Sequence, residues 1–138
     1  MSVGLYLGFD FGFRRIGVAV GQALTVSASP VRVILAKQGV PDWLEVAQLI
    51  KAWRPEALIV GLPLANNDEP LYTTKAAKKF ARQLEARFEL PVHMVDERYT
   101  TIEAKAQLFS QGGVRKVQRA SVDCVAACII LEQWMGGL

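Results

Sequence analysis

The chain has 138 residues, of which 51% are hydrophobic and 21% charged, and its formal net charge is +3. This length predicts one domain, residues 1–138, and this balance excludes a disordered chain. No apolar stretch approaches the roughly 20 residues of a membrane-spanning helix, and the first residues lack the pattern of a signal peptide. We therefore expect a cytoplasmic protein that makes no membrane contact, and its mildly basic charge permits nucleic acid as a partner.

The first forty residues are patterned as strands. Residues 5–9 form a near-continuous apolar run, which is typical of a strand covered on both faces. Residues 16–20 alternate between branched and small side chains, as in a second strand. Residues 27–30 break this pattern, and residues 31–36 resume it. The segment therefore predicts an antiparallel meander of three strands.

Beyond Gly39 the hydrophobic period becomes helical. Asp42 is placed to cap a helix that Pro55 terminates. The elements expected after it are a strand (57–60), an amphipathic helix (72–88), a strand (92–95), a helix that starts with a capping box (100–110) and a buried helix (118–134). This order predicts an α/β fold with a mixed sheet, in which the meander lies on one side and βαβ crossovers on the other.

Three apolar segments each deliver a carboxylate. Asp10 ends the first strand, Asp96 and Glu97 follow the fifth, and Asp123 is the only charged residue within residues 120–131. A buried, unpaired carboxylate is costly, so several of them on separate buried elements indicate a site for a divalent cation such as Mg²⁺ or Mn²⁺. Which of Asp96 and Glu97 points inward stays open from the residues alone, with Glu97 favoured as the ligand and Asp96 as a supporting residue.

Each carboxylate also has a purely structural interpretation. Asp10 could start a turn, the Asp96–Glu97 pair could form a loop with Arg98, and Asp123 could cap or orient a helix. Gly12 favours a functional role for Asp10, because a glycine there lets the backbone approach a phosphate or metal.

Basic and hydroxyl residues near these carboxylates complete the predicted site. A ring of basic side chains around an acidic centre suits a phosphodiester substrate. The basic candidates are Arg14, Arg15, Arg98, Arg115, Lys116 and Arg119. Thr100 and Thr101 are supporting residues and are expected to cap the following helix. The basic face of residues 72–88 is expected to be an ordinary solvated surface, and Cys124 and Cys128 are expected to be small core residues.

Four blocks of the sequence occur in an order that resembles the YqgF family. They are residues 7–20, 60–64, 96–104 and 123–127. The family is described as Holliday-junction-resolvase-like or as a nuclease of pre-16S ribosomal RNA. The resemblance implies an RNase H-like fold, with a five-stranded mixed sheet whose second strand is antiparallel to the rest. It also implies acidic site residues, which map onto Asp10, Glu97 and Asp123.

We therefore predict a metal-dependent nuclease that hydrolyses phosphodiester bonds, with Mg²⁺ or Mn²⁺ held by the three carboxylates. The resemblance favours RNA as the substrate, in processing of the 5′ end of pre-16S rRNA, and a DNA junction is the alternative. A non-catalytic RNA- or protein-binding module on the same fold is a second alternative. A nucleotide-binding module of the actin and sugar-kinase type is a third, although it needs two such domains around a cleft.

Overall fold

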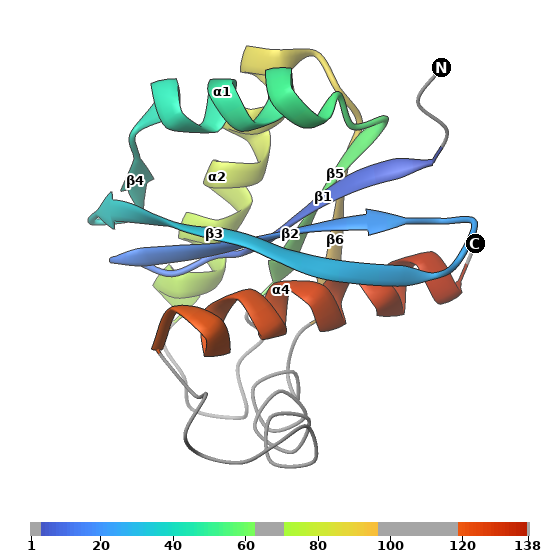
Figure 1. Cartoon of the computed structure of the whole chain (residues 1–138). Coiled ribbons are helices and arrows are strands. Elements are labelled where there is room, and N and C mark those ends of the chain that lie inside the picture. Colours follow the sequence, from blue (N-terminus) through green and yellow to red (C-terminus); the bar gives the residue numbers. More distant parts are fainter. Residues whose placement is uncertain (1–3, 63–70, 97–118, 138) are drawn as a thin grey trace.

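A computed structural model describes residues 4–62, 71–96 and 119–137, which form a mixed sheet covered by helices on both faces (Figure 1). The strand order is β4-β3-β2-β1-β5-β6. The strands are β1 (Leu5–Asp10), β2 (Arg15–Gln22), β3 (Ser27–Lys37), β4 (Val40–Pro41), β5 (Ala57–Leu62) and β6 (Val92–Asp96). β1 pairs antiparallel with β2 and parallel with β5, and β5 pairs parallel with β6. The predicted α/β fold with an antiparallel second strand is confirmed.

The meander differs from its prediction at two places. β4 is a sixth strand of two residues, which pairs with the end of β3 at a place where the sequence predicted no strand. β3 begins at Ser27 rather than at residue 31, so residues 27–30 do not break it. A register shift opposite Val18 and Ala19 accommodates this stretch. Pro30 is tolerated because β3 pairs there with β2 alone among the described strands, and its missing N–H then interrupts no second ladder.

Two helices, α1 (Trp43–Trp53) and α2 (Leu71–Phe88), cover one face of the sheet, and α4 (Arg119–Gly136) covers the other (Figure 1). α1 begins as predicted, because the Asp42 side chain accepts a hydrogen bond from the Leu44 N–H at 3.0 Å. The helix predicted over residues 100–110 lies outside the described residues. Among the helices that are described, none is long and apolar enough to cross a membrane.

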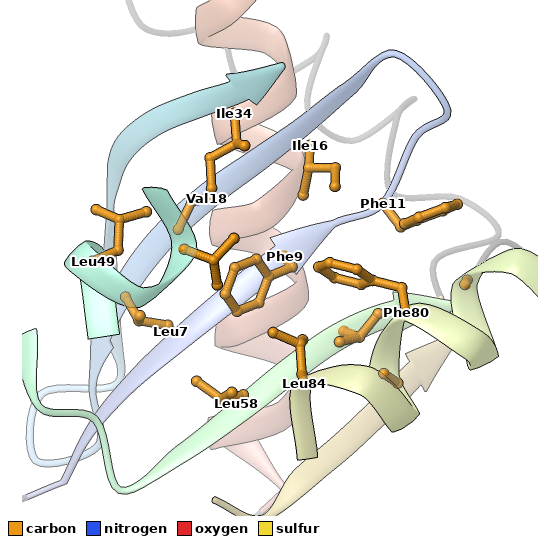
Figure 2. Close-up of a cluster of buried hydrophobic side chains, with 14 residues drawn as sticks. Leu7, Phe9, Phe11, Ile16, Val18, Ile34, Leu49, Leu58, Phe80 and Leu84 are labelled. Atoms are coloured by element: carbon orange, nitrogen blue, oxygen red, sulfur yellow. The ribbon is translucent and has the colours of Figure 1, made fainter. Parts of the chain in front are cut away.

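In the core beneath α1 and α2, side chains from the carboxyl end of β1 pack against α2 (Figure 2). The Phe80 ring lies 5.7 Å from the Phe9 ring and 5.4 Å from the Phe11 ring, measured between centroids. Phe80 and Leu84 are both buried, as the amphipathic pattern of α2 predicted. The contacts of Phe80 set the middle of α2 level with the carboxyl end of β1.

The other face of the sheet is lined by small residues, and α4 packs closely on it. A Cβ atom added to Gly8 would lie 2.5 Å from Leu131 Cγ, and one added to Gly21 would lie 2.8 Å from Met135 Cε. Ala19 is fully buried beneath the same helix. The alternation of branched and small residues in β2 therefore divides its two faces between the two core clusters, as the sequence predicted.

The two cysteines of α4 are buried, in agreement with the sequence interpretation. Burial raises the pKa of Cys128 from its ordinary 9.0 to about 12, and the nearby Glu132 carboxylate and Cys124 thiol add to the increase. We expect the Cys128 thiol to resist alkylation by iodoacetamide at pH 8 in the folded protein and to react in urea. Mass spectrometry after a timed pulse would measure this, and rapid modification of Cys128 without denaturant would contradict it.

The same shift predicts how Cys128 affects stability at alkaline pH. Because the thiol ionises in the unfolded chain first, its contribution to stability is present below pH 9 and is lost as the pH rises toward 12.

Candidate active site

Asp10 is the last residue of β1, in the middle of the sheet. It pairs with Gly17 of β2 on one side and with Gly61 of β5 on the other. Directly paired residues share a face of a sheet, and neither of these neighbours carries a side chain. The half-buried Asp10 carboxylate therefore lies at the carboxyl end of a central strand, where α/β sheets bind ligands, without a side chain in either flanking position.

The register between β1 and α4 continues to Asp10. The Tyr6 ring lies 4.9 Å from the Trp134 ring, and the next residue on this face, Gly8, packs against Ala127 and Leu131. Asp10 follows on the same face, because side chains alternate along a strand. On α4 the positions 123, 127, 130 and 134 share one stripe, given 3.6 residues per turn. Along the strand the order is Tyr6, Gly8, Asp10, and along the helix stripe the order is 134, 130, 127, 123. Position 123 therefore follows Ala127 on the helix as Asp10 follows Gly8 on the strand.

The packing of β6 shows to which face of the sheet the Asp96 position belongs. Val92 and Met94 pack on the α2 side of the sheet, whereas Val95 packs on the α4 side. Asp96 pairs with Leu62 and has the same parity as Met94, so its position lies on the face opposite to that of Asp10. Glu97 lies outside the described residues.

The loop that follows Asp10 is fixed by backbone contacts. A Cβ atom added to Gly12 would lie 2.5 Å from the Arg15 carbonyl oxygen, so the loop requires a glycine at this position. The Arg14 carbonyl accepts a hydrogen bond from the Ala36 N–H at 2.8 Å, and the Phe13 carbonyl accepts one from the Gly39 N–H at 2.9 Å. β3 and the turn after it therefore hold the loop on the sheet.

The two arginines of this loop differ in exposure. Arg14 is exposed, whereas Arg15 is half-buried and is the first residue of β2. Arg15 has the parity of Gly17, which places it on the face of Asp10. Both are thus at the carboxyl end of β1, where the sequence predicted a basic rim.

The remaining predicted site residues are only partly described. Arg98, Thr100, Thr101, Arg115 and Lys116 lie outside the described residues. Arg119 begins α4 and Asp123 belongs to its second turn, but the structure describes only their backbone. Within the described ranges, no three His, Cys, Asp or Glu side chains form a cluster that could hold a metal ion.

The sequence interpretation missed the glycines that shape the site. Gly61 and Gly8 were noted only within the sequence blocks 60–64 and 7–20, and neither was predicted to shape the site. The available signal was glycine inside a strand, which often marks the close approach of another segment or a ligand.

The fold is RNase H-like, and it is shared with two solved resolvase structures. RuvC of Thermus thermophilus in complex with a Holliday junction superposes with a TM-score of 0.62 at 20% identity, covering 97% of this chain and 94% of that one. The fowlpox virus resolvase with Holliday junction DNA superposes with a TM-score of 0.59 at 12% identity, covering 96% and 97%. At these identities the likeness shows the fold alone.

Sequence comparison then gives the family. The chain belongs to the RuvX family, described as Holliday junction resolvase, whose profile matches residues 4–137. A Legionella pneumophila protein named "Putative pre-16S rRNA nuclease" is 60% identical over 135 residues, covering 98% of this chain and 97% of its own length. An Azotobacter vinelandii protein of the same name is 51% identical over 131 residues, covering 95% and 92%. The resemblance to the YqgF family is thereby confirmed.

Proposed function

We propose that the protein is a metal-dependent nuclease that cleaves phosphodiester bonds of pre-16S rRNA at the 5′ end. The register of β1 against α4 supports this proposal, because position 123 follows Ala127 along the helix in the direction in which Asp10 follows Gly8 along the strand. The names of the relatives in Legionella and Azotobacter support the reaction and the substrate. A cytoplasmic location fits an enzyme that acts on a ribosomal RNA precursor.

Asp10, Glu97 and Asp123 would hold the cation, Mg²⁺ or Mn²⁺. The donor set is made of carboxylate oxygens, which these hard cations prefer. Gly17 and Gly61 beside Asp10 leave space for a cation that keeps some of its waters. The parity of β6 favours Glu97 over Asp96, because the Asp96 position belongs to the face opposite to Asp10. Asp96 keeps the supporting role that the sequence predicted.

The residues of the chain hold the substrate against this centre. Paired strands on both sides fix the backbone of Asp10, so its carboxylate is preorganised. Arg14 and Arg15, on the loop pinned by β3, bind phosphates that flank the scissile one, and Arg98, Arg115, Lys116 and Arg119 extend the basic rim. A bound divalent cation supplies charge neutralisation at the scissile phosphate and lowers the pKa of an attacking water.

Cleavage assays on a panel of substrates test the proposal. We expect wild-type protein with Mn²⁺ to cut a labelled RNA that spans the 5′ boundary of 16S rRNA, and a chelator to stop the reaction. The panel includes single-stranded RNA, duplex RNA and a four-way DNA junction. Cleavage of the junction with intact RNA would favour the second candidate, a DNA resolvase, which the description of the family supports. No cleavage of any substrate would favour a non-catalytic module.

A further inference from the structure

The exposed face of α2 carries a stripe of positive charge. Lys75, Lys78, Lys79 and Arg82 are all exposed and follow the i, i+3, i+4, i+7 spacing of one helix face. The stripe rises over about 10 Å along the helix axis. Within the described part of the chain, none of these four side chains forms an ion pair. Their charges are thus available to an external anion.

A groove lies beside this stripe, between α2 and β6. Its volume is about 290 Å³, and it is lined by Lys78, Ala81, Arg82, Glu85, Val92 and Met94. The last two come from β6, which is at the edge of the described sheet. The groove therefore has an apolar floor, formed by Ala81, Val92 and Met94. Its charged rim has two basic side chains, Lys78 and Arg82, and one carboxylate, Glu85.

The stripe and groove lie on the α2 side of the sheet, whereas the Asp10 position belongs to the α4 side. Phe80, between Lys79 and Arg82 in sequence, contacts Phe9 and Phe11, the residues on either side of Asp10. β6 is two strands from β1, a separation of roughly 10 Å. A nucleic-acid chain bound at Asp10 would thus reach this surface by passing over the carboxyl edge of the sheet.

We propose that this surface, the α2 stripe with the α2–β6 groove, binds a single-stranded segment of the nucleic-acid substrate, an inference that rests on the proposed nuclease function. The basic side chains contact successive phosphates, and the floor of Ala81, Val92 and Met94 receives a base or sugar. An acidic peptide would also be attracted by the charges. The apolar floor beside a periodic basic stripe favours the nucleic acid, whose apolar base faces alternate with its charges.

Binding of a short fluorescent single-stranded RNA, with a chelator present to prevent cleavage, tests the proposal by anisotropy. We expect the double variant Lys78→Gln/Arg82→Gln to bind roughly 25-fold more weakly at about 0.1 M salt, and its log–log salt slope to be smaller by about 1.4, since each lost phosphate contact changes the slope by about 0.7. The matched control, Lys51→Gln/Arg54→Gln, removes two exposed cations at the far end of α1 and should leave both quantities unchanged.

A variant that removes a negative charge distinguishes an effect of charge on RNA binding from an effect of misfolding. Glu85→Gln removes the carboxylate of the groove and should tighten binding. In cleavage assays Lys78→Gln/Arg82→Gln should raise KM and leave kcat unchanged, because these residues do not touch the reacting atoms. The inference would be overturned if Lys78→Gln/Arg82→Gln bound the RNA with wild-type affinity and salt slope. It would also be overturned if this variant lost binding to an acidic peptide and kept its binding to RNA. In both cases, cleavage by the wild-type protein would still support the nuclease function. Wild-type protein that neither binds nor cleaves nucleic acid would overturn both.

Discussion

Replacing Asp10 by Asn is expected to lower Mn²⁺-dependent cleavage at least about a thousand-fold, which corresponds to roughly 4 kcal/mol of lost transition-state stabilisation. Asn has nearly the same shape as Asp but no charge, so it is a poor ligand for a hard divalent cation. The pairing of residue 10 with Gly17 and Gly61 uses the backbone and is retained. Single-turnover cleavage of the 5′-boundary RNA would measure the rate, and circular dichroism would check the fold.

The matched control for this change is Asp42→Asn. Asp42 caps α1 from an exposed position, and Asn caps a helix about as well as Asp. We therefore expect this variant to keep both its activity and its melting temperature. Undiminished cleavage by Asp10→Asn would exclude Asp10 from the site. Equal losses in both variants would point to a general effect of the lost negative charge.

Replacing Gly8 by Ala is expected to destabilise the protein by about 1–3 kcal/mol, the usual cost of overpacking a core. The added Cβ would lie 2.5 Å from Leu131 Cγ and 3.2 Å from the Ala127 carbonyl oxygen, so α4 must move away from the sheet. Because α4 also carries Asp123, cleavage should fall more than stability alone explains. Urea denaturation, with cleavage measured far below the unfolding midpoint, would separate the two effects.

Two variants make this prediction specific. Gly136→Ala adds a methyl group where no atom lies within 4 Å, and it should leave stability nearly unchanged. Leu131→Ala alone should cost about 2–5 kcal/mol by leaving a cavity. The double variant Gly8→Ala/Leu131→Ala should be more stable than the sum of the single losses predicts, because the second change removes the atom that the first one meets. Strict additivity would contradict the contact.

The sequence predicted the sheet well because its strands and helices have strong and different periods. The branched and small faces of β2, the cap at Asp42 and the buried face of α2 each depend on local patterns that the fold obeys. β4 could not be predicted, since a two-residue strand has no period and depends on its pairing with the end of β3. The strand start at Ser27 depends likewise on a register shift that only the partner strand reveals.

The candidate site could be predicted only as a set of residue types. Asp10 was located correctly at the end of a strand, but its glycine neighbours Gly17 and Gly61 come from other strands and are paired with it only by the sheet. The residues alone left open whether Asp96 or Glu97 points inward, because the face to which the Asp96 position belongs follows from the packing of β6 in the sheet. The α2–β6 groove could not be predicted either, because its lining residues come from two segments that are separated in sequence. The basic face of α2 alone is typical of any solvated helix.

The packing of α4 on glycine and alanine has a consequence for when the enzyme becomes active. Position 123 belongs to the same stripe as Ala127 and Trp134, which hold the helix on β1. Under the proposed function, one carboxylate thus reaches the site only when the segment after residue 118 has been synthesised and has docked. On that proposal, a nascent chain that has folded its strands alone would lack one of the three carboxylates and would not cut RNA on the ribosome that is making it.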